Sequence, residues 1–347
     1  LRWGGGQSGF GVGALITSIG NDEIKPERIQ EYEFGLETEF LNAYGFDFTY
    51  YYSFAEESII GFPNPPSSGL TATNVPTNVG EVVSWGFESM FYASPIIEED
   101  YQLDLSIILN YSENEIQSLG GAQPIVGGFG ELGWYPNQPR SAFMTNKVVG
   151  ALFDPETGQY LGPDVEEEVS YAGTPIPIYT GSFSVDFRFL KYFSVGMLWE
   201  FAAGHKISNQ TRSYQINYGN DVEYNELHEE LAGLEPGTAE YEEVATEIAK
   251  LNSNWYYNFI EDGDWLRLRE LSFRVNATEW ITDLLGDSYI KRFNVLMSAR
   301  NVLFFTKYSG VDPEVNFTGT GTNVTRGVDF LTMQHPRTFN FQVNIGF

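Results

Sequence analysis

The end of the chain reads Arg337-Thr338-Phe339-Asn340-Phe341-Gln342-Val343-Asn344-Ile345-Gly346-Phe347, and apolar and polar side chains alternate along its whole length. In a β-strand, successive side chains point to opposite faces, so one face here is apolar and the other is polar or small. In a soluble sandwich the apolar face would meet another sheet. In an outer-membrane barrel it meets lipid, while the polar face borders a wet lumen. We expect the barrel, because the chain ends on this strand without a cap or tail.

The composition is compatible with a barrel and argues against several other classes. The chain has 347 residues, 16% aromatic residues and a mean hydropathy of −0.23, and no stretch approaches 18 continuous apolar residues. These values argue against a bundle of membrane helices, whereas alternation lowers the mean hydropathy of a spanning strand. A formal net charge of −28 argues against nucleic acid as a partner, because phosphates need a basic surface. The absence of cysteine excludes disulfides and thiolate chemistry.

Alternating segments recur along the chain, and the connections between them are alternately short and long. Outer-membrane barrels have brief periplasmic turns and extended outer loops. Counted back from a periplasmic C-terminus, every long connection falls outside, which predicts extracellular loops at about 56–78, 113–178, 204–263 and 305–336. The predicted strands lie at roughly 30–42, 44–55, 79–93, 101–112, 179–190, 192–203, 264–276, 289–304 and 337–347, with a weaker, glycine-rich one inside 1–19.

Two segments depart from plain alternation. In strand 264–276, Arg267 and Arg269 share a parity with apolar neighbours, which predicts a bulge or a strand end. Residues 225–251 show helical spacing that is interrupted at Glu235-Pro236-Gly237. This pattern predicts a short helical hairpin in an outer loop.

Six stretches, in this order along the chain, resemble motifs of the SusC/RagA-type TonB-dependent outer-membrane transporters of Bacteroidetes. Singly the stretches are weakly specific, but their order and the strand parity together make a strong match over most of the chain. Each also has a structural interpretation as a turn or a strand border, and we interpret them chiefly as barrel architecture. The stretches are Gly20-Asn21-Asp22-Glu23-Ile24-Lys25-Pro26-Glu27-Arg28 with Glu31-Tyr32-Glu33-Phe34-Gly35, Asn78-Val79-Gly80-Glu81 with Trp85-Gly86-Phe87-Glu88, Gly173-Thr174-Pro175-Ile176-Pro177, Asp264-Trp265-Leu266-Arg267-Leu268-Arg269, Arg300-Asn301-Val302-Leu303 with Ser309-Gly310-Val311-Asp312-Pro313-Glu314, and Pro336-Arg337-Thr338-Phe339.

The resemblance implies an all-β fold, a transmembrane antiparallel β-barrel of about 22 strands that encloses a plug. Residues 1–347 would form roughly its last ten strands. No signal peptide is recognisable at the start of the chain, so we expect the plug domain and the first strands to lie outside it.

In function, the resemblance implies import of an oligosaccharide or peptide across the bacterial outer membrane. The implied partners are a SusD-like surface lipoprotein that covers the barrel mouth, the TonB complex acting through the plug, the remainder of the barrel and outer-membrane lipid.

Two aromatic clusters in the predicted outer loops are the candidate substrate-binding residues. Trp and Tyr rings stack on the CH faces of sugars, while nearby amides and acids bind hydroxyl groups. The alternatives are an interfacial aromatic belt, or packing of the loops against the lipoprotein. The residues are Trp134 and Tyr135 in one cluster and Trp255, Tyr256 and Tyr257 in the other.

No cofactor is expected, although two acidic clusters resemble Ca²⁺ ligands in chemistry. Glu166-Glu167-Glu168 and Asp154 with Glu156 offer hard oxygen atoms in the outer loops. Neither has the spacing of an EF-hand. Solvated loop carboxylates are therefore the preferred interpretation, with Ca²⁺ binding as the alternative.

Two other function classes remain open beside the importer. The second hypothesis is a barrel that serves as a protein-binding or adhesion platform through its loops. The third is a small outer-membrane hydrolase, in which Asp221 and His228 would be a candidate pair. We expect no enzyme, because neither these residues nor His205 and His335 occur in a known catalytic motif.

Overall fold

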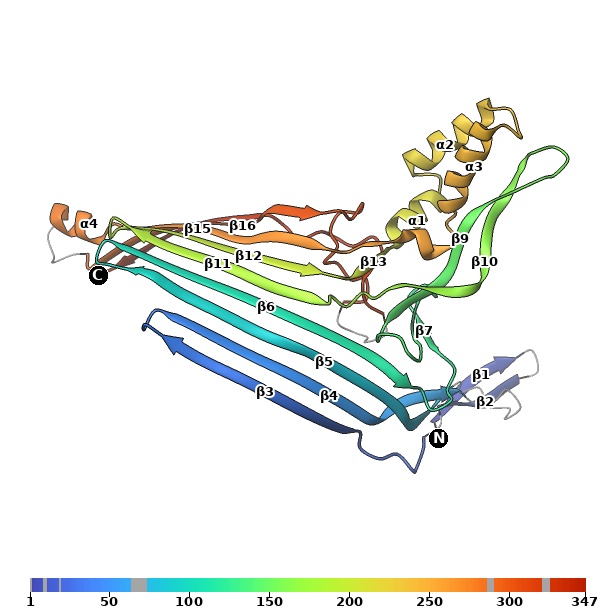
Figure 1. The fold of residues 1–347 in the computed structure, drawn as a ribbon, viewed down its shortest axis with the longest axis horizontal. Coiled ribbons are helices and arrows are strands. Elements are labelled where there is room, and N and C mark those ends of the chain that lie inside the picture. The colour runs from blue at the N-terminus through green and yellow to red at the C-terminus, as the bar shows by residue number, and fades with distance from the viewer. Residues whose placement is uncertain (1, 9–10, 19, 64–73, 286–289, 320–324) are drawn as a thin grey trace.

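One antiparallel sheet dominates the computed structural model, which describes residues 2–8, 11–18, 20–63, 74–285, 290–319 and 325–347 (Figure 1). The strand order of this sheet is β18-β16-β15-β12-β11-β6-β5-β4-β3, so its strands follow one another as they do along the chain. These nine strands confirm the nine predicted ones in number and order. They are β3 (Arg28–Phe40), β4 (Tyr44–Pro63), β5 (Asn74–Ile97), β6 (Tyr101–Ser118), β11 (Tyr179–Phe189), β12 (Phe193–Ala203), β15 (Trp265–Asn276), β16 (Arg292–Thr306) and β18 (Thr338–Gly346).

Short and long connections lie at opposite ends of the sheet, as the sequence predicts (Figure 1). Two of the short ones are hairpin turns whose central residues both have positive φ: 56° and 49° at Leu41 and Asn42, and 50° and 64° at Leu190 and Lys191. Positive φ at both central positions is the geometry of a type I′ turn, whose twist matches that of the paired strands. The C-terminus and helix α4 (Thr278–Leu285) lie at this same end.

The strand register separates apolar from polar side chains across the sheet. One row of cross-strand partners is Leu103, Phe187, Val195, Phe273, Met297 and Phe341. The adjacent row is Asp104, Asp186, Gly196, Ser272, Ser298 and Asn340. We call the two sides the apolar face and the polar face. The apolar face is uncovered in the part of the chain that the structure describes, with Phe341 68% exposed, as expected of a wall that meets lipid.

The irregularity predicted in β15 is a β-bulge at Arg269. The register against both neighbouring strands shifts between Leu268 and Glu270. The extra residue leaves Arg267 and Arg269 on the polar face and returns the apolar side chains that follow to the apolar face. In the paired strand β16, Asn301 has a φ of 56°, a left-handed conformation that asparagine tolerates.

The first two predicted outer loops contain β-strands, whereas the sequence pattern predicted only connections there. The loop predicted at 56–78 is shorter, because β4 and β5 remain paired as far as Pro63 and Asn74. The segment 113–178 contains the end of β6 and a separate sheet of order β10-β9-β8-β7. Backbone pairing can continue past the lipid, where the side chains no longer need to alternate. The four strands are β7 (Ile125–Gly127), β8 (Leu132–Trp134), β9 (Ala142–Phe153) and β10 (Tyr160–Gly173).

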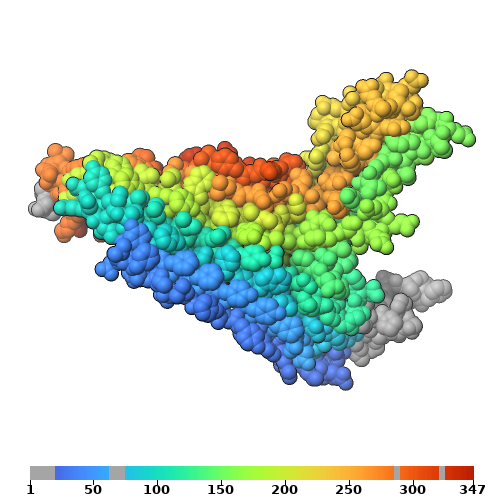
Figure 2. All heavy atoms as spheres, viewed as in Figure 1, coloured from blue at the N-terminus to red at the C-terminus, as the bar shows by residue number. Residues whose placement is uncertain are grey.

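The segment 204–263 contains the predicted helical hairpin, α2 (Val222–Gly233) and α3 (Ala239–Lys250). The side chains of Asp221 and Thr238 accept N-capping hydrogen bonds from the first turns of the two helices. Tyr241 of α3 accepts a hydrogen bond from the Tyr160 amide of β10, at 3.1 Å. Figure 2 shows the hairpin and the β9–β10 arm standing out from the sheet together. The remaining elements are β13 (Lys206–Asn209), α1 (Gln210–Asn217), the 3₁₀ helix η2 (Tyr256–Phe259) and β14 (Ile260–Asp262).

The remaining strands are short or separate from the large sheet. The predicted weak strand inside 1–19 is instead two strands, β1 (Arg2–Ser8) and β2 (Gly11–Ser18), which pair with each other. In the segment 305–336, β17 (Val328–Asp329) pairs with β13 in parallel. No helix in the described ranges is long and apolar enough to cross a membrane.

The face assignment predicts opposite results for two adjacent arginine substitutions in β18. Phe341→Arg places a charge in lipid, at a cost of about 2–4 kcal/mol near the bilayer midplane. Asn340→Arg places the same charge on the polar face, where water hydrates it. In a heat-modifiability assay on outer membranes, Phe341→Arg should reduce the folded fraction and Asn340→Arg should not. Equal losses would contradict the assignment.

Candidate functional site

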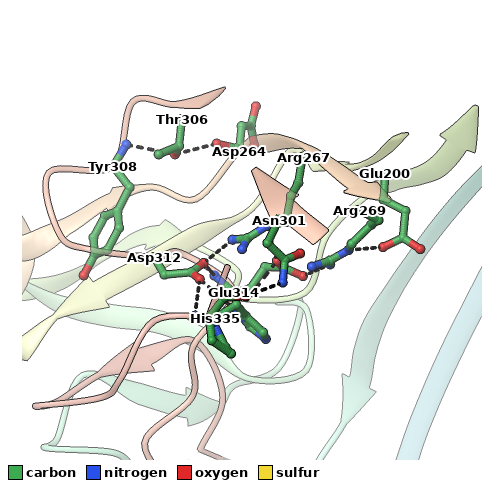
Figure 3. A network of polar contacts seen from close by, with 11 residues as sticks. Glu200, Asp264, Arg267, Arg269, Asn301, Thr306, Tyr308, Asp312, Glu314 and His335 are labelled. Atoms are coloured by element: carbon green, nitrogen blue, oxygen red, sulfur yellow. Dashed lines mark hydrogen bonds and ion pairs between the residues drawn. The ribbon is translucent and has the colours of Figure 1, made fainter. Parts of the chain in front are cut away.

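The segment 307–336 is here called the inner loop, and its described residues, 307–319 and 325–336, lie against the polar face of the sheet. Figure 3 shows two arginines of β15 pointing toward carboxylates of this loop. The loop starts from a fixed point, because Thr306 Oγ1 donates a hydrogen bond to the Asp264 carbonyl at 2.8 Å. Near its other end, Asn301 Nδ2 donates to the Pro336 carbonyl at 3.0 Å. The left-handed conformation of Asn301 in β16 thus directs its side-chain amide toward the loop.

Arg267 is the buried centre of the contact between the sheet and the inner loop. Its side chain is 3% exposed, and its Nη2 donates to Asp312 Oδ1 at 2.7 Å. Its Nε lies 2.8 Å from Glu314 Oε2, and its guanidinium carbon lies 4.1 Å from the centroid of the Phe304 ring. A buried charge is tolerated only when it is paired in this way. The two carboxylates therefore anchor the loop to the wall.

Arg269 extends the network along the sheet. Its Nε lies 2.5 Å from Glu200 Oε2 of β12, and its Nη2 forms an ion pair with Glu314. Both arginines reach the same carboxylate only because the bulge places them on one face. The Asp312-Pro313-Glu314 motif thus forms part of the architecture, in agreement with its interpretation from the sequence.

Asp312 is ionised within this network. His335 Nδ1 lies 2.9 Å from Asp312 Oδ2, and the His335 amide donates to the same oxygen at 3.1 Å. Burial of Asp312 opposes ionisation, but the hydrogen bonds from His335, from the Glu314 amide and from Arg267 outweigh it and hold the pKa below its usual value. Asp312, Glu314 and His335 offer ligand atoms within 4.8 Å of one another, a spacing that fits a metal ion. The Arg267 guanidinium already supplies positive charge at that point.

A cavity of about 860 Å³ lies between the polar face and the inner loop. Its wall combines hydroxyl, amide and charged groups with the flat surfaces of one tryptophan and several prolines. This combination suits a ligand with both polar and apolar surfaces. The sheet contributes Asn110, Thr180, Ser182, Glu200, Trp265 and Arg269, and the loops contribute Pro175, Pro177, His205, Pro313, Glu314, Asn316 and Arg326.

His205 lines this cavity as a neutral side chain. It is 7% exposed, and burial is the main cause that lowers its pKa, against the opposing effect of Asp264. Its Nδ1 lies 3.7 Å from Asp264 Oδ1 and has no hydrogen-bond partner among the described residues. The imidazole is therefore uncharged at neutral pH and retains hydrogen-bonding capacity.

The first predicted aromatic cluster does not line the cavity. Trp134, in β8, packs against the buried side chains of Ile60, Ile116 and Leu119. Tyr135 follows it directly, and burial raises the pKa of its hydroxyl. Both residues thus lie within the packed outer loops, away from the residues that line the cavity. Their role as substrate contacts stays a prediction.

The second cluster lies in and beside η2. Burial is the main cause that raises the pKa of Tyr256, and the nearby charge of Glu131 adds to it. Lys147 Nζ lies 5.7 Å from the centroid of the Tyr257 ring. Trp255 directly precedes the 3₁₀ helix and is partly buried. These three residues are also outside the set that lines the cavity, and substrate binding by them stays a prediction.

Glu131 is a buried carboxylate that the sequence did not reveal. It is fully buried and accepts hydrogen bonds from Ser208 Oγ at 3.0 Å and from Gln210 Nε2 at 3.2 Å. Burial raises the pKa of this carboxyl, in spite of these donors. It joins two loops whose contacting residues are far apart in sequence. No motif marks it, because the contact exists only after both loops have folded.

The acidic and histidine residues weighed from the sequence are engaged in local structure. Asp154 accepts hydrogen bonds from the amides of Glu156 and Thr157, as in an Asx turn. Asp221 caps α2 and forms an ion pair with Arg212 at 3.2 Å, while His228 packs edge-on against a tyrosine ring. Asp221 and His228, the candidate pair of the hydrolase hypothesis, therefore each contact other residues and do not form a hydrogen-bonded pair. Calcium binding in the outer loops stays a prediction.

The wall, its alternating faces and the inward loop define the class of protein. An exposed apolar face opposite a polar face that holds a folded-in loop is the geometry of a large outer-membrane barrel. Residues 3–199 match the model of the family described as TonB dependent receptor-like, beta-barrel. The chain belongs to this family, and its place is the outer membrane of Gram-negative bacteria.

Similar proteins and solved structures support this assignment. TonB-dependent receptors P3 and P39 of Formosa agariphila are 23% and 22% identical, each over 96% of this chain, and the matches span 36% and 37% of those proteins. The RagAB peptide transporter shares the fold with a TM-score of 0.77 at 19% identity, covering 100% of this chain and 38% of that chain. The resemblance to SusC/RagA-type transporters and the transmembrane barrel predicted from the sequence are confirmed. The chain spans just over a third of the length of these relatives.

Loss of the Asp312 carboxylate should release the inner loop. Asp312→Asn leaves buried Arg267 with one charge partner fewer, and breaking a buried pair costs about 3–5 kcal/mol. We expect faster protease cleavage between residues 307 and 319 and a lower temperature of heat modification. The control is Glu247→Gln, which removes an exposed ion pair with Lys250 and should cost roughly 0.5 kcal/mol or less. Equal sensitivity of the two variants would contradict the anchoring role.

The inner loop should detach only in acid. Because the folded-state pKa of Asp312 lies below its ordinary value of 3.8, its stabilising contribution is complete above that pH and is lost as the pH falls through the lowered pKa. The protection of the amides of residues 307–319, measured relative to exchange in an unstructured chain at the same pH, should therefore stay constant between about pH 5 and pH 8 and should fall below about pH 4. Asp312→Asn should abolish this transition. A transition above about pH 5 would contradict the assignment to Asp312.

Proposed function

We propose that this chain forms part of the wall and of the outer vestibule of a TonB-dependent importer for an oligosaccharide or peptide nutrient. Its membership of the receptor family supports this proposal. So does the cavity between the polar face and the inner loop, because an importer needs a wet surface that binds its substrate on the way in. In this proposal energy comes from the TonB complex through a plug domain.

The cavity is the proposed substrate contact within this chain. Its amides and hydroxyls can exchange hydrogen bonds with sugar hydroxyls or with peptide groups. Trp265 and the prolines offer apolar surfaces to a sugar ring or to a side chain. The ion pairs beneath it keep the loop side of the cavity in one conformation, and this preorganisation lowers the entropic cost of binding.

A SusD-like surface lipoprotein is the proposed partner at the outer end. The segments 113–178 and 204–263 project there as the β9–β10 arm and the α2–α3 hairpin (Figure 2). Such folded arms offer a rigid surface to a protein that covers the barrel mouth. Trp134, Tyr135, Trp255, Tyr256 and Tyr257 belong to these segments, so in this proposal they either bind substrate near the lid or hold the arms in shape.

Filling the cavity should block uptake. Ser182 and Phe183 are adjacent in β11 and lie on opposite faces of the sheet. Ser182→Trp places an indole in the cavity, whereas Phe183→Trp replaces one aromatic by another toward lipid. Substrates are first identified by growth on a panel of oligosaccharides and peptides, and initial uptake of the labelled substrate is then measured. We expect Ser182→Trp to reduce uptake at least tenfold and Phe183→Trp to retain most of it.

Two controls complete the uptake experiment. Both variants should reach the membrane in the folded, heat-modifiable form. A protonophore should abolish uptake by the unchanged protein, as expected of transport driven through TonB. Full uptake by folded Ser182→Trp would refute the cavity as a substrate contact, and uptake without a proton-motive force would refute the TonB-dependent importer.

A further inference from the structure

Helix α4 joins β15 to β16 at the end of the sheet where the short turns lie (Figure 1). The sequence predicts only a connection between the strands 264–276 and 289–304 at this place, and no helix. The helix is attached firmly, since Thr278 Oγ1 accepts a hydrogen bond from the Phe293 amide at 3.0 Å. Its Glu279 accepts a hydrogen bond from Tyr192 at 2.7 Å and pairs with Lys191 at 2.6 Å. The orientation of α4 relative to the wall is thereby set.

The helix presents large apolar side chains without a covering partner. Trp280 and Leu284 are one helical turn apart and therefore lie on the same side. They are 44% and 77% exposed, values that are unfavourable for large apolar groups in water. Glu279 and Asp283 are likewise one turn apart, so they share the neighbouring side of the helix, and both are exposed. The helix is thus amphipathic, with its apolar side open.

Contacts of Trp280 show which way the open side points. Its ring centroid lies 5.0 Å from that of Tyr192 and 5.9 Å from that of Phe193. Phe193 pairs with Phe189 across the hairpin and belongs to the apolar face. The Phe193 ring centroid lies 5.4 Å from that of Phe189 and 6.0 Å from that of Phe273, and both of these rings also belong to the apolar face. Trp280 therefore extends an aromatic row of the lipid-facing surface.

The occupant of this side follows from that continuity. The apolar face meets lipid up to the row of Phe189, Phe193 and Phe273, at the end of the strands. A helix that begins at this border, with a tryptophan against the aromatic rings and acidic residues on the neighbouring side, has the pattern of an interfacial helix. We propose that α4 is a membrane anchor that lies in the periplasmic leaflet, with Trp280 and Leu284 among the lipids.

Single spin labels test this proposal directly, because residues 1–347 contain no cysteine and any cysteine elsewhere in the transporter is first replaced by serine. Leu284→Cys and the matched control Asp283→Cys are labelled with a nitroxide in the complete transporter. The protein is reconstituted in vesicles of phosphatidylethanolamine and phosphatidylglycerol, and heat modifiability verifies the folded barrel. The collision rates of each label with oxygen, which enters lipid, and with a water-soluble nickel chelate are then measured.

Lipid immersion gives a clear expected result. The ratio of oxygen to nickel collisions at residue 284 should exceed that at residue 283 at least threefold in the vesicles. Equal ratios in vesicles would place α4 in water and overturn the proposal. Low collision rates with both reagents at residue 284 would show that a protein surface or a second copy covers the helix, which would overturn it as well.

Discussion

The structure depends on one constraint: backbone polar groups in lipid must find their partners in neighbouring strands, because no water is available there. Because the nine strands are paired without a break, every strand must place its apolar side chains on the same face of the sheet. A row of partners such as Val195, Phe273 and Met297 is therefore apolar throughout, and the next row is polar throughout. A one-residue slip anywhere would turn a whole strand inside out. This is why the alternation is strict where the strands cross the membrane.

The bulge at Arg269 shows how the wall accommodates an exception. Without an extra residue, the parity of β15 would turn its arginines toward the side of Leu271. The bulge absorbs that mismatch, keeps both arginines on the polar face and aims them at one carboxylate of the inner loop. Asn301 absorbs the matching irregularity in β16 and holds the other end of the loop. The irregular part of the sheet is thus the part that positions the candidate site.

The sequence predicted the features that the membrane imposes on the strands, but it did not predict the contacts that the outer loops make with one another. Strand order, the ends that carry short turns, the bulge and the α2–α3 hairpin follow from local patterns, so they could be predicted. The sheet β7–β10 and the burial of Glu131 depend on contacts such as that with Ser208, 77 residues away. Helix α4 is only eight residues long, too short for a clear periodicity. The cavity combines side chains from four strands and three loops, and no local pattern contains such a combination.

The net charge of the chain gives a misleading impression of the polar face. The acidic residues of β3 lie on the polar face, where Glu37 is the cross-strand neighbour of Asp47 in β4. Several arginines lie on the polar face near the opposite end of the strand order, in β15 and β16. There the inner loop neutralises Arg267 and Arg269, and Arg300 pairs with Glu270. Charges inside a barrel act over a short range in salt solution. The cavity is therefore lined by a balanced set of charges, although the chain as a whole is strongly acidic, and the proposed substrate would be recognised by hydrogen bonds and stacking more than by net charge.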